Sequence, residues 1–294
     1  MNEPVSIITA SYNYENLIKE TIESVIGQTY KNWELIIVDD GSKDNSVDVI
    51  KSYCAKDERI KLYQHNNGEN KGLAETIKLG LEKAQSDWVI FLESDDTIRP
   101  DYIEKKLEVI KNYPDIKFIY NDVNLFGDED RIKEYGEYFE KFYTYTKNTT
   151  FPANITKDLG KLNLIPTFSC VMCRKEILKN LSLDCIYKDT LDWHLWSQIA
   201  YKYDVYYVDE KLTNWRIHKD SYINRGKRNK YKDAYFYKIQ IKDNLTGGKQ
   251  KLLNRISFIL AILKSIRRSI ISVRINKKEI SLKLFNIKIF EKLL

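Results

Sequence analysis

The sequence is poor in cysteine and has no long hydrophobic run. Four cysteines among 294 residues are too few for the disulfide framework of a small secreted protein. The apolar run at residues 256–263 has eight residues, whereas a membrane-spanning helix needs roughly 20. The chain enters a strand-like segment at Val5 without the charged and apolar regions of a signal peptide. We therefore expect neither an integral membrane protein nor a secreted module, and free thiols fit a cytoplasmic location.

Glycine and proline are also scarce, with 11 and five residues, which excludes a collagen-like repeat. No Gly-x-Gly-x-x-Gly follows the first predicted strand, and no Gly-x-x-x-x-Gly-Lys-Ser/Thr occurs. A dinucleotide-binding Rossmann site and a Walker-type ATPase are therefore not expected. If the chain binds a nucleotide diphosphate, we expect a metal ion rather than a glycine-rich loop to hold the phosphates.

Charge is abundant and unevenly distributed. Hydrophobic residues make up 43% of the chain and charged residues 31%, which allows a real core in one large domain or two small ones. The net charge is +6, yet residues 249–294 hold 12 basic and two acidic residues, which leaves the first 248 residues at −4. Such asymmetry indicates that the tail meets an anionic surface, and a solvated tail without a partner is the alternative.

The basic tail has the pattern of an amphipathic helix. Over residues 251–272, apolar residues recur at helical spacing with basic residues at the flanks, although Arg267 intrudes on the stripe. This pattern is typical of a helix in a membrane interface, and packing on the rest of the chain or on a second subunit is the alternative. We expect residues 244–294 to form a basic helical C-terminal extension on an anionic membrane surface, and we expect no nucleic-acid partner.

Apolar runs alternate with helical periodicity in the first 120 residues. Strands are predicted at residues 5–10, 35–38, 60–63, 88–92 and 117–120, and helices at 16–26, 46–53, 73–84 and 100–111. This alternation predicts an α/β fold. Because several of the predicted strands are continuous apolar runs, we expect a mostly parallel central sheet with helices on both faces.

The following hundred residues are less regular. Residues 124–158 are predicted to be loop-like, 168–172 to form a strand, and 193–200 to form a helix. Cys170 and Cys173 are predicted to be buried thiols, because a zinc site needs about four ligands. Trp193 and Trp196 are predicted to lie in the core, with a ligand-stacking surface as the alternative. His65 is predicted to lie at the surface or at a strand edge.

Acidic clusters follow two of the predicted strands. Asp39 and Asp40 come directly after the second strand, and residues 93–96, Glu-Ser-Asp-Asp, follow the fourth. Ligands of open α/β sheets bind beyond the carboxyl ends of the strands, where clustered carboxylates repel each other unless a cation or donors satisfy them. Mg²⁺ and Mn²⁺ prefer such oxygen ligands. The alternative is that these residues only cap a helix and fill a turn.

Five motifs occur in order along the first hundred residues. They are VSIITASYN at 5–13, the segment 17–30 ending in SVIGQTY, WELIIVDDGSKD at 33–44, NKGLA at 70–74 and FLESDD at 91–96. In this order they resemble the inverting family-2 glycosyltransferases with the GT-A fold, and segments 190–196 and 215–218 extend the resemblance. It implies that residues 1–120 bind a nucleotide sugar, and that residues 121–243 bind the acceptor and carry the catalytic base.

The resemblance also implies roles for individual residues. Those placed around the nucleotide sugar are Ala10, Tyr12, Asp39, Asp40, Lys78, Glu93 and Asp95. Asp96 and His218 would hold Mn²⁺ or Mg²⁺ against the two phosphates, and Asp192 aligns with the catalytic base.

Four positions depart from the family's pattern. Leu191 stands where Glu often precedes the catalytic Asp. Ile77 and Lys78 replace an Arg-Asn pair, so that Lys78 either meets a phosphate or simply faces solvent. Glu93 replaces a shorter Asp, which alters the expected metal geometry.

The implied activity is metal-assisted transfer of a hexosyl or N-acetylhexosaminyl group from a UDP-linked donor, with inversion. The acceptor would be a hydroxyl of a surface-glycan or lipid-linked glycan precursor, as in capsule or lipopolysaccharide synthesis. With the basic tail, this implies a peripheral protein at the inner face of the cell membrane. A nucleotidyltransferase and a non-catalytic membrane- or nucleic-acid-binding module on an inactive transferase domain are the alternatives.

Overall fold

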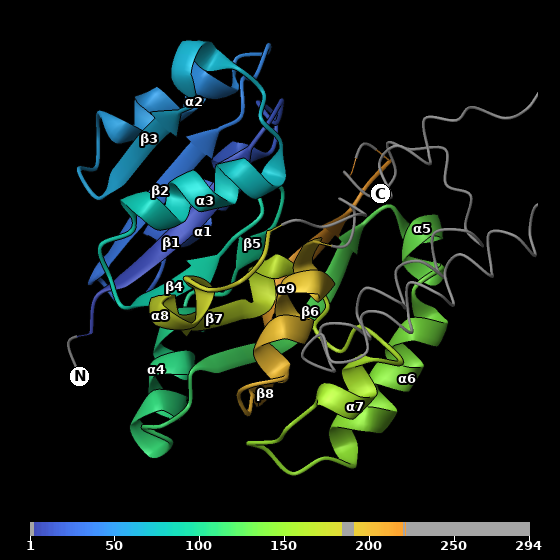
Figure 1. Cartoon of the computed structure of the whole chain (residues 1–294). Helices are drawn as coiled ribbons and strands as arrows, with labels where there is room; N and C mark the ends of the chain where they lie inside the picture. Colours follow the sequence, from blue (N-terminus) through green and yellow to red (C-terminus); the bar gives the residue numbers. More distant parts are fainter. Residues whose placement is uncertain (1–2, 184–190, 220, 222–294) are drawn as a thin grey trace, which may run out of the picture. The chain divides into compact units, whose positions relative to one another are not determined.

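A computed structural model of the chain describes residues 3–183, 191–219 and 221. In these residues the strands form one eight-stranded sheet in the order β3-β2-β1-β4-β7-β6-β8-β5 (Figure 1). The predicted boundary at residue 120 falls within β6, so both predicted halves contribute to the same sheet.

The first half of the sheet is parallel and closely follows the prediction. Its elements are β1 (Val5–Ser11), α1 (Ile18–Ile26), β2 (Trp33–Asp39), α2 (Ser46–Cys54), β3 (Ile60–Gln64), the 3₁₀ turn η1 (Asn66–Gly68), α3 (Leu73–Lys83) and β4 (Trp88–Phe91). Strands β3, β2, β1 and β4 pair in parallel. The alternating side chains of β1 divide between two cores: Ile7 packs with Ile18 of α1, and Ile8 packs with Ile77 of α3. Helices therefore cover both faces, as predicted.

The second half of the sheet contains antiparallel pairs. Its elements are β5 (Thr97–Ile98), α4 (Tyr102–Asn112), β6 (Phe118–Gly127), α5 (Glu129–Lys133), α6 (Gly136–Lys147), α7 (Thr156–Leu159), the 3₁₀ turn η2 (Phe168–Cys170), β7 (Val171–Arg174), α8 (Lys175–Leu178), α9 (Leu191–Ala200) and β8 (Tyr206–Ile217). Strand β7 runs antiparallel to both β4 and β6. Strand β8 is parallel to β6 and antiparallel to β5. Because β6 and β8 run in the same direction as β4, the carboxyl ends of β8 and β4 lie at the same edge of the sheet.

The prediction of a loop at 124–158 is wrong. This segment holds the end of β6 and the helices α5, α6 and α7. Helix α6 buries Phe139, Phe142 and Thr146 on one face, and its many tyrosines and charged residues hide this stripe in the sequence. The strand predicted at 168–172 is displaced, because η2 comes first and β7 begins at Val171.

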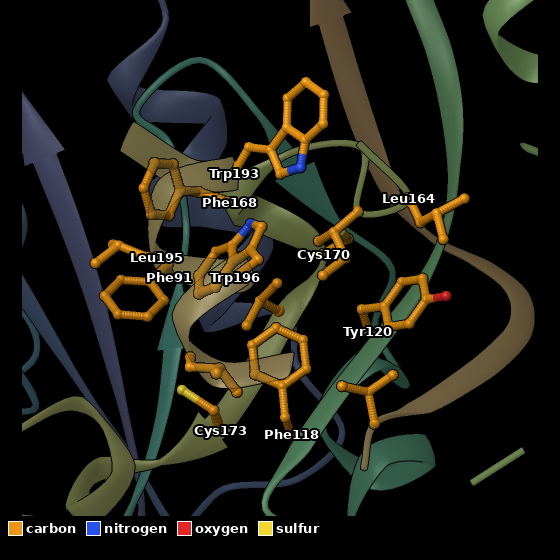
Figure 2. Close-up of a cluster of buried hydrophobic side chains, with 14 of the residues drawn as sticks. Phe91, Phe118, Tyr120, Leu164, Phe168, Cys170, Cys173, Trp193, Leu195 and Trp196 are labelled. Atoms are coloured by element: carbon orange, nitrogen blue, oxygen red, sulfur yellow. The ribbon is translucent and has the colours of Figure 1, made fainter. Parts of the chain in front are cut away.

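Trp196 of α9 lies at the centre of a buried aromatic cluster (Figure 2). Its ring centroid lies 5.2 Å from that of Phe118, 5.3 Å from Phe168 and 6.0 Å from Phe91. Trp193 is also buried, and its Nε1 donates a hydrogen bond to the Leu159 carbonyl at 2.8 Å. Both tryptophans therefore belong to the core, as predicted, and they fix α9 against the sheet.

Cys170 and Cys173 are fully buried free thiols, which confirms the prediction. Burial raises the pKa of the Cys170 thiol to about 12, so it stays protonated and unreactive in the folded protein.

Among the residues that the structure describes, no helix has the length and apolar character needed to cross a bilayer. The predicted extension, 244–294, lies outside the described residues. Its amphipathic helix and its membrane surface remain predictions.

Candidate active site

A pocket of about 350 Å³ opens at the carboxyl ends of β1, β2 and β4, where the parallel strands were expected to gather polar residues. Of the residues predicted for a site, those that line it are Ala10, Tyr12, Asp40, Glu93, Asp95 and Asp192. Tyr14 and Trp215 also line it, and sequence reasoning had not selected them. Tyr14 stands two residues after Tyr12 in the same loop, which was the available signal.

The two aspartates that end β2 are held differently. Asp39 is fully buried, and its Oδ2 accepts hydrogen bonds from the Ser42 N–H at 3.1 Å and from Gln64 Nε2 at 3.2 Å. It does not line the pocket and instead holds the turn after β2. Asp40 lines the pocket, and its carboxylate accepts from the backbone N–H groups of Lys71 at 2.7 Å and Gly72 at 2.9 Å. Because Gly72 has a φ of +84°, this approach of the loop favours glycine.

His65 lies beside Asp40 and Thr76. Its side chain is 7% exposed, and its Nε2 lies 3.5 Å from Asp40 Oδ1 and 3.1 Å from Thr76 Oγ1. The side chain therefore does not face solvent, although His65 directly follows β3, the edge strand of the sheet. His65 follows β3, the neighbour of β2 in the sheet, and that adjacency was the signal that could have placed it beside Asp40.

The two aspartates of the turn after β4 lie in different surroundings. Asp95 lines the pocket, and its Oδ2 lies 2.9 Å from His218 Nε2. Asp96 is fully buried and outside the lining. Its Oδ1 accepts from the Arg216 backbone N–H at 2.9 Å, and its Oδ2 accepts from Ser169 Oγ at 2.6 Å. With both oxygens engaged by the protein, Asp96 anchors the turn and leaves Asp95 facing the cavity.

Glu93 lines the same pocket and accepts a short hydrogen bond from the Thr167 hydroxyl. Burial, with the neighbouring charge of Asp95 and a smaller effect of Asp192, raises the pKa of Glu93 to about 8. The carboxyl group is therefore largely protonated at neutral pH in the ligand-free protein.

Asp192 lies in the first turn of α9 and lines the pocket. Its Oδ2 accepts a hydrogen bond from Asn163 Nδ2 at 3.0 Å. Burial raises the pKa of Asp192 to about 6, while the Asn163 hydrogen bond opposes that rise. At neutral pH it is mainly an ionised carboxylate with a pKa suited to accepting a proton.

Lys78 lies away from the pocket. It is on α3, its side chain is 54% exposed, and its Nζ lies 3.6 Å from Glu75 Oε2. Ile77 lines the cavity instead, because consecutive helical residues point about 100° apart. In the structure, Lys78 faces solvent, which was the alternative considered for it.

The family model described as Glycosyl transferase family 2 matches residues 6–182. The chain belongs to glycosyl transferase family 2. Among its relatives, the putative teichuronic acid biosynthesis glycosyltransferase TuaG of Bacillus subtilis is 31% identical over 233 residues, covering 79% of this chain and 86% of that protein. An uncharacterized glycosyltransferase of Haemophilus influenzae is 45% identical over 108 residues, which cover 36% of this chain and only 42% of that protein.

Solved structures of glycosyltransferases share the fold. TarS 1–349 of S. aureus in complex with UDP-GlcNAc has a TM-score of 0.60 at 17% identity, covering 82% of this chain and 66% of that chain. The mannosyltransferase PcManGT from Pyrobaculum calidifontis, in complex with GDP-Man and Mn²⁺, has a TM-score of 0.54 at 14% identity, covering 90% and 80%. At these identities the likeness shows the GT-A fold alone.

Family-2 glycosyltransferases of the GT-A type commonly use a divalent metal. The part of the chain that the structure describes holds no group of three His, Cys, Asp or Glu side chains arranged around a metal position. Asp95 and His218 form a pair, with 2.9 Å between Oδ2 and Nε2. Ligands about 2.1 Å from an octahedral ion, at neighbouring corners, lie about 3 Å apart. The two groups are hydrogen-bonded to each other at a spacing compatible with neighbouring ligand positions of such an ion, while both oxygens of Asp96 accept hydrogen bonds from the protein.

Proposed function

We propose that this protein transfers a sugar from a nucleotide-diphosphate donor to an acceptor hydroxyl, with inversion at the anomeric carbon. The observation that carries the proposal is that Asp192 shares one pocket with Asp40 and Asp95. A base, a nucleoside-binding carboxylate and a phosphate-side carboxylate are thereby available to a single ligand. Membership of glycosyl transferase family 2 supports the reaction class.

The nucleoside is proposed to lie against the ends of β1 and β2. Tyr12 and Ala10 line this side of the pocket, and a tyrosine ring provides a stacking surface for a base. Asp40 is held by two backbone N–H groups and by proximity to His65, which fixes its carboxylate for a hydrogen bond to the base or ribose. Asp39 shapes the turn that presents Asp40.

The diphosphate is proposed to lie beside Asp95 and His218, which would hold Mn²⁺ or Mg²⁺. The bound ion would neutralise charge that develops on the leaving diphosphate. Asp96 then acts as the anchor of this turn, which differs from the ligand role expected from the sequence. Glu93, hydrogen-bonded to Thr167, borders the space between the diphosphate and Asp192.

Asp192 is proposed to remove the proton from the attacking acceptor hydroxyl. The hydroxyl oxygen forms the new bond to the anomeric carbon as the bond to the diphosphate breaks, and the carboxylate takes the proton. The transition state resembles an oxocarbenium ion, as in glycoside hydrolysis. One displacement with one base inverts the anomeric configuration.

Three finer assignments rest on the comparisons and on the tail. The TarS structures contain UDP or UDP-GlcNAc, which supports a UDP-linked donor. The name of TuaG refers to teichuronic acid biosynthesis, which supports a surface polysaccharide or its lipid-linked precursor as acceptor. The 12 basic residues of 249–294 support a peripheral position on an anionic membrane face.

Thermal denaturation with nucleotides tests the proposal. The intact protein would be melted with UDP, GDP and ADP, and with UDP-sugars, each with and without Mn²⁺. A ligand that binds only the native state stabilises it by about 2.7 kcal/mol at a hundredfold excess over Kd. We expect a metal-dependent rise in Tm with UDP. No shift with any of these nucleotides would contradict the proposal.

A further inference from the structure

The hydroxyl of Ser169 joins the two ends of the acidic turn at residues 93–96. Its Oγ accepts a hydrogen bond from the Glu93 backbone N–H at 2.9 Å and donates one to Asp96 Oδ2 at 2.6 Å. Ser169 is fully buried and does not line the pocket, so it has no direct access to a ligand there. Its hydroxyl therefore acts on the pocket only through the turn.

Ser169 is itself fixed from two other elements. Its carbonyl oxygen accepts hydrogen bonds from the Tyr102 hydroxyl of α4 at 3.0 Å and from Thr213 Oγ1 of β8 at 3.1 Å. The fully buried Lys106 donates to the Tyr102 hydroxyl at 2.8 Å and to the next carbonyl, that of Cys170, at 2.7 Å. The turn is thus attached to a rigid support, since buried polar networks with satisfied partners hold one geometry.

The acidic turn is short and brings three carboxyl groups close together. Glu93, Asp95 and Asp96 lie within four residues, and a backbone hydrogen bond from the Asp96 N–H to the Glu93 carbonyl at 3.3 Å closes the turn. The Ser169 hydroxyl, bonded to the Glu93 N–H at one end and to Asp96 Oδ2 at the other, holds the two ends of this turn together. Asp95 then stays beside His218, where its Oδ2 and Nε2 lie 2.9 Å apart.

We propose that Ser169 is a positioning residue for donor binding, and that its hydroxyl holds Asp95 in the geometry that binds the divalent ion and the diphosphate. This inference rests on the proposed function. Groups that hydrogen-bond to a metal ligand commonly change metal affinity 10–100-fold when they are removed, and Ser169, which acts one step further away through Asp96 and the Glu93 N–H, should lie at the lower end of that range.

Ser6 provides a matched control. It is also fully buried, and its Oγ accepts from the Ser86 backbone N–H at 3.0 Å and donates to Glu34 Oε1 at 2.7 Å. Ser6 lies near the amino end of β1, whereas the pocket lies at the carboxyl ends of the strands. Ser6→Ala therefore removes the same two types of hydrogen bond without touching the acidic turn.

The experiment compares the wild type, Ser169→Ala and Ser6→Ala as full chains. Calorimetry would measure the affinity for UDP at saturating Mn²⁺, and paramagnetic broadening of water protons would measure Mn²⁺ binding in the presence of UDP. Uridine binding without metal reports the nucleoside side alone. We expect Ser169→Ala to weaken both metal-dependent affinities about tenfold or more, with uridine binding unchanged. Ser6→Ala should leave all three affinities within about twofold of wild type while losing similar thermal stability.

Equal metal-dependent affinities for Ser169→Ala and Ser6→Ala would overturn the inference while leaving the proposed function intact. A wild type that binds neither Mn²⁺ nor UDP would instead overturn the proposed function itself, together with the inference that rests on it. If Ser169→Ala does not fold, Ser169→Cys takes its place. Its thiol fills similar space but is a weak donor, and we expect the same metal-dependent loss. Wild-type affinity in Ser169→Cys would overturn the role of the hydroxyl.

Discussion

His218 Nε2 lies 2.9 Å from Asp95 Oδ2, although 123 residues separate them in the chain. The contact exists because β7 is antiparallel to β4 and β6, and β8 then returns parallel to β6. Arg216, two residues before His218, secures the junction. Its Nε donates to the Asp95 carbonyl at 2.8 Å, and its guanidinium forms a salt bridge with Glu20 of α1. The pair therefore belongs to a defined junction of strand ends.

The metal assignment predicts different effects for neighbouring aspartates. Asp95→Asn should weaken Mn²⁺ binding in the presence of UDP about tenfold or more, because it removes a charged oxygen ligand. Asp96→Asn keeps an oxygen that accepts from the Arg216 N–H and loses only the acceptor for Ser169 Oγ, so it should lower the melting temperature and weaken Mn²⁺ binding less than Asp95→Asn does. Electron paramagnetic resonance of free Mn²⁺ measures the Mn²⁺ affinity of both variants. A larger loss of Mn²⁺ affinity for Asp96→Asn than for Asp95→Asn would indicate that Asp96 holds the metal ion, as expected from the sequence.

The sequence predicted the first half of the fold because local patterns there agree with the tertiary structure. Strand β2 contains the continuous apolar run 35–38, and α3 carries a periodic apolar stripe, so each element can be recognised from its own residues. β8 was not predicted, because Tyr206–Ile217 mixes charged and polar residues, such as Asp209, Glu210 and Lys211, with its apolar ones and has no long continuous apolar run. Its pairing with β6 is long-range, and such pairing leaves little trace in local periodicity.

For the site, the sequence predicted which segments gather but not the direction of each side chain. Adjacent residues in a turn point to different sides, so Asp39 and Asp40, or Asp95 and Asp96, are chemically equal in the sequence and different in space. Hydrogen bonds from distant residues, such as the one from Ser169 to Asp96, decide which carboxylate is enclosed. The roles of the individual residues remain predictions until ligand binding is measured.

Lys78 should have little effect on donor binding. Its side chain is 54% exposed and pairs with Glu75 on the same helix, so Lys78→Ala should leave the Kd for UDP within about twofold of wild type. Tyr12→Ala should weaken UDP binding more, because base stacking on an aromatic ring contributes about 1–3 kcal/mol. Isothermal titration of both variants checks this. A loss for Lys78→Ala as large as that for Tyr12→Ala would mean that the lysine reaches the phosphates.

Asp192→Asn should abolish turnover while retaining donor binding. The amide keeps the size of the side chain, but it cannot accept the acceptor's proton, and general-base catalysis contributes about 10²–10⁴-fold. Release of UDP measures kcat, and titration with UDP and Mn²⁺ measures binding. Asn154→Ala, a change away from the pocket, serves as the control with near-normal turnover. If Asp192→Asn instead lost UDP affinity and kept kcat, the base would have to be another residue.

The pH dependence of turnover should report the carboxylate of Asp192. Its pKa is raised to about 6, chiefly by burial, and only the deprotonated form can act as a base. Activity should therefore fall below about pH 6 and reach a plateau above it. Asn163 Nδ2 donates a hydrogen bond to Asp192 Oδ2, which favours the ionised carboxylate. Asn163→Ala should therefore raise the pKa of Asp192 and move the fall in activity to higher pH.

Asn154 supplies the matched control for that shift. The side-chain oxygens of Asn163 and Asn154 both accept from the N–H two residues later, at 3.2 Å and 3.1 Å. The amide nitrogen of Asn154, however, donates to the Ala200 carbonyl and not to Asp192. Asn154→Ala should therefore leave the midpoint unchanged, as measured by UDP release between pH 5 and pH 9. If the midpoint shifted equally in both variants, the shift would reflect a general loss of structure. If it shifted in neither, the fall in activity at low pH would belong to a group other than Asp192.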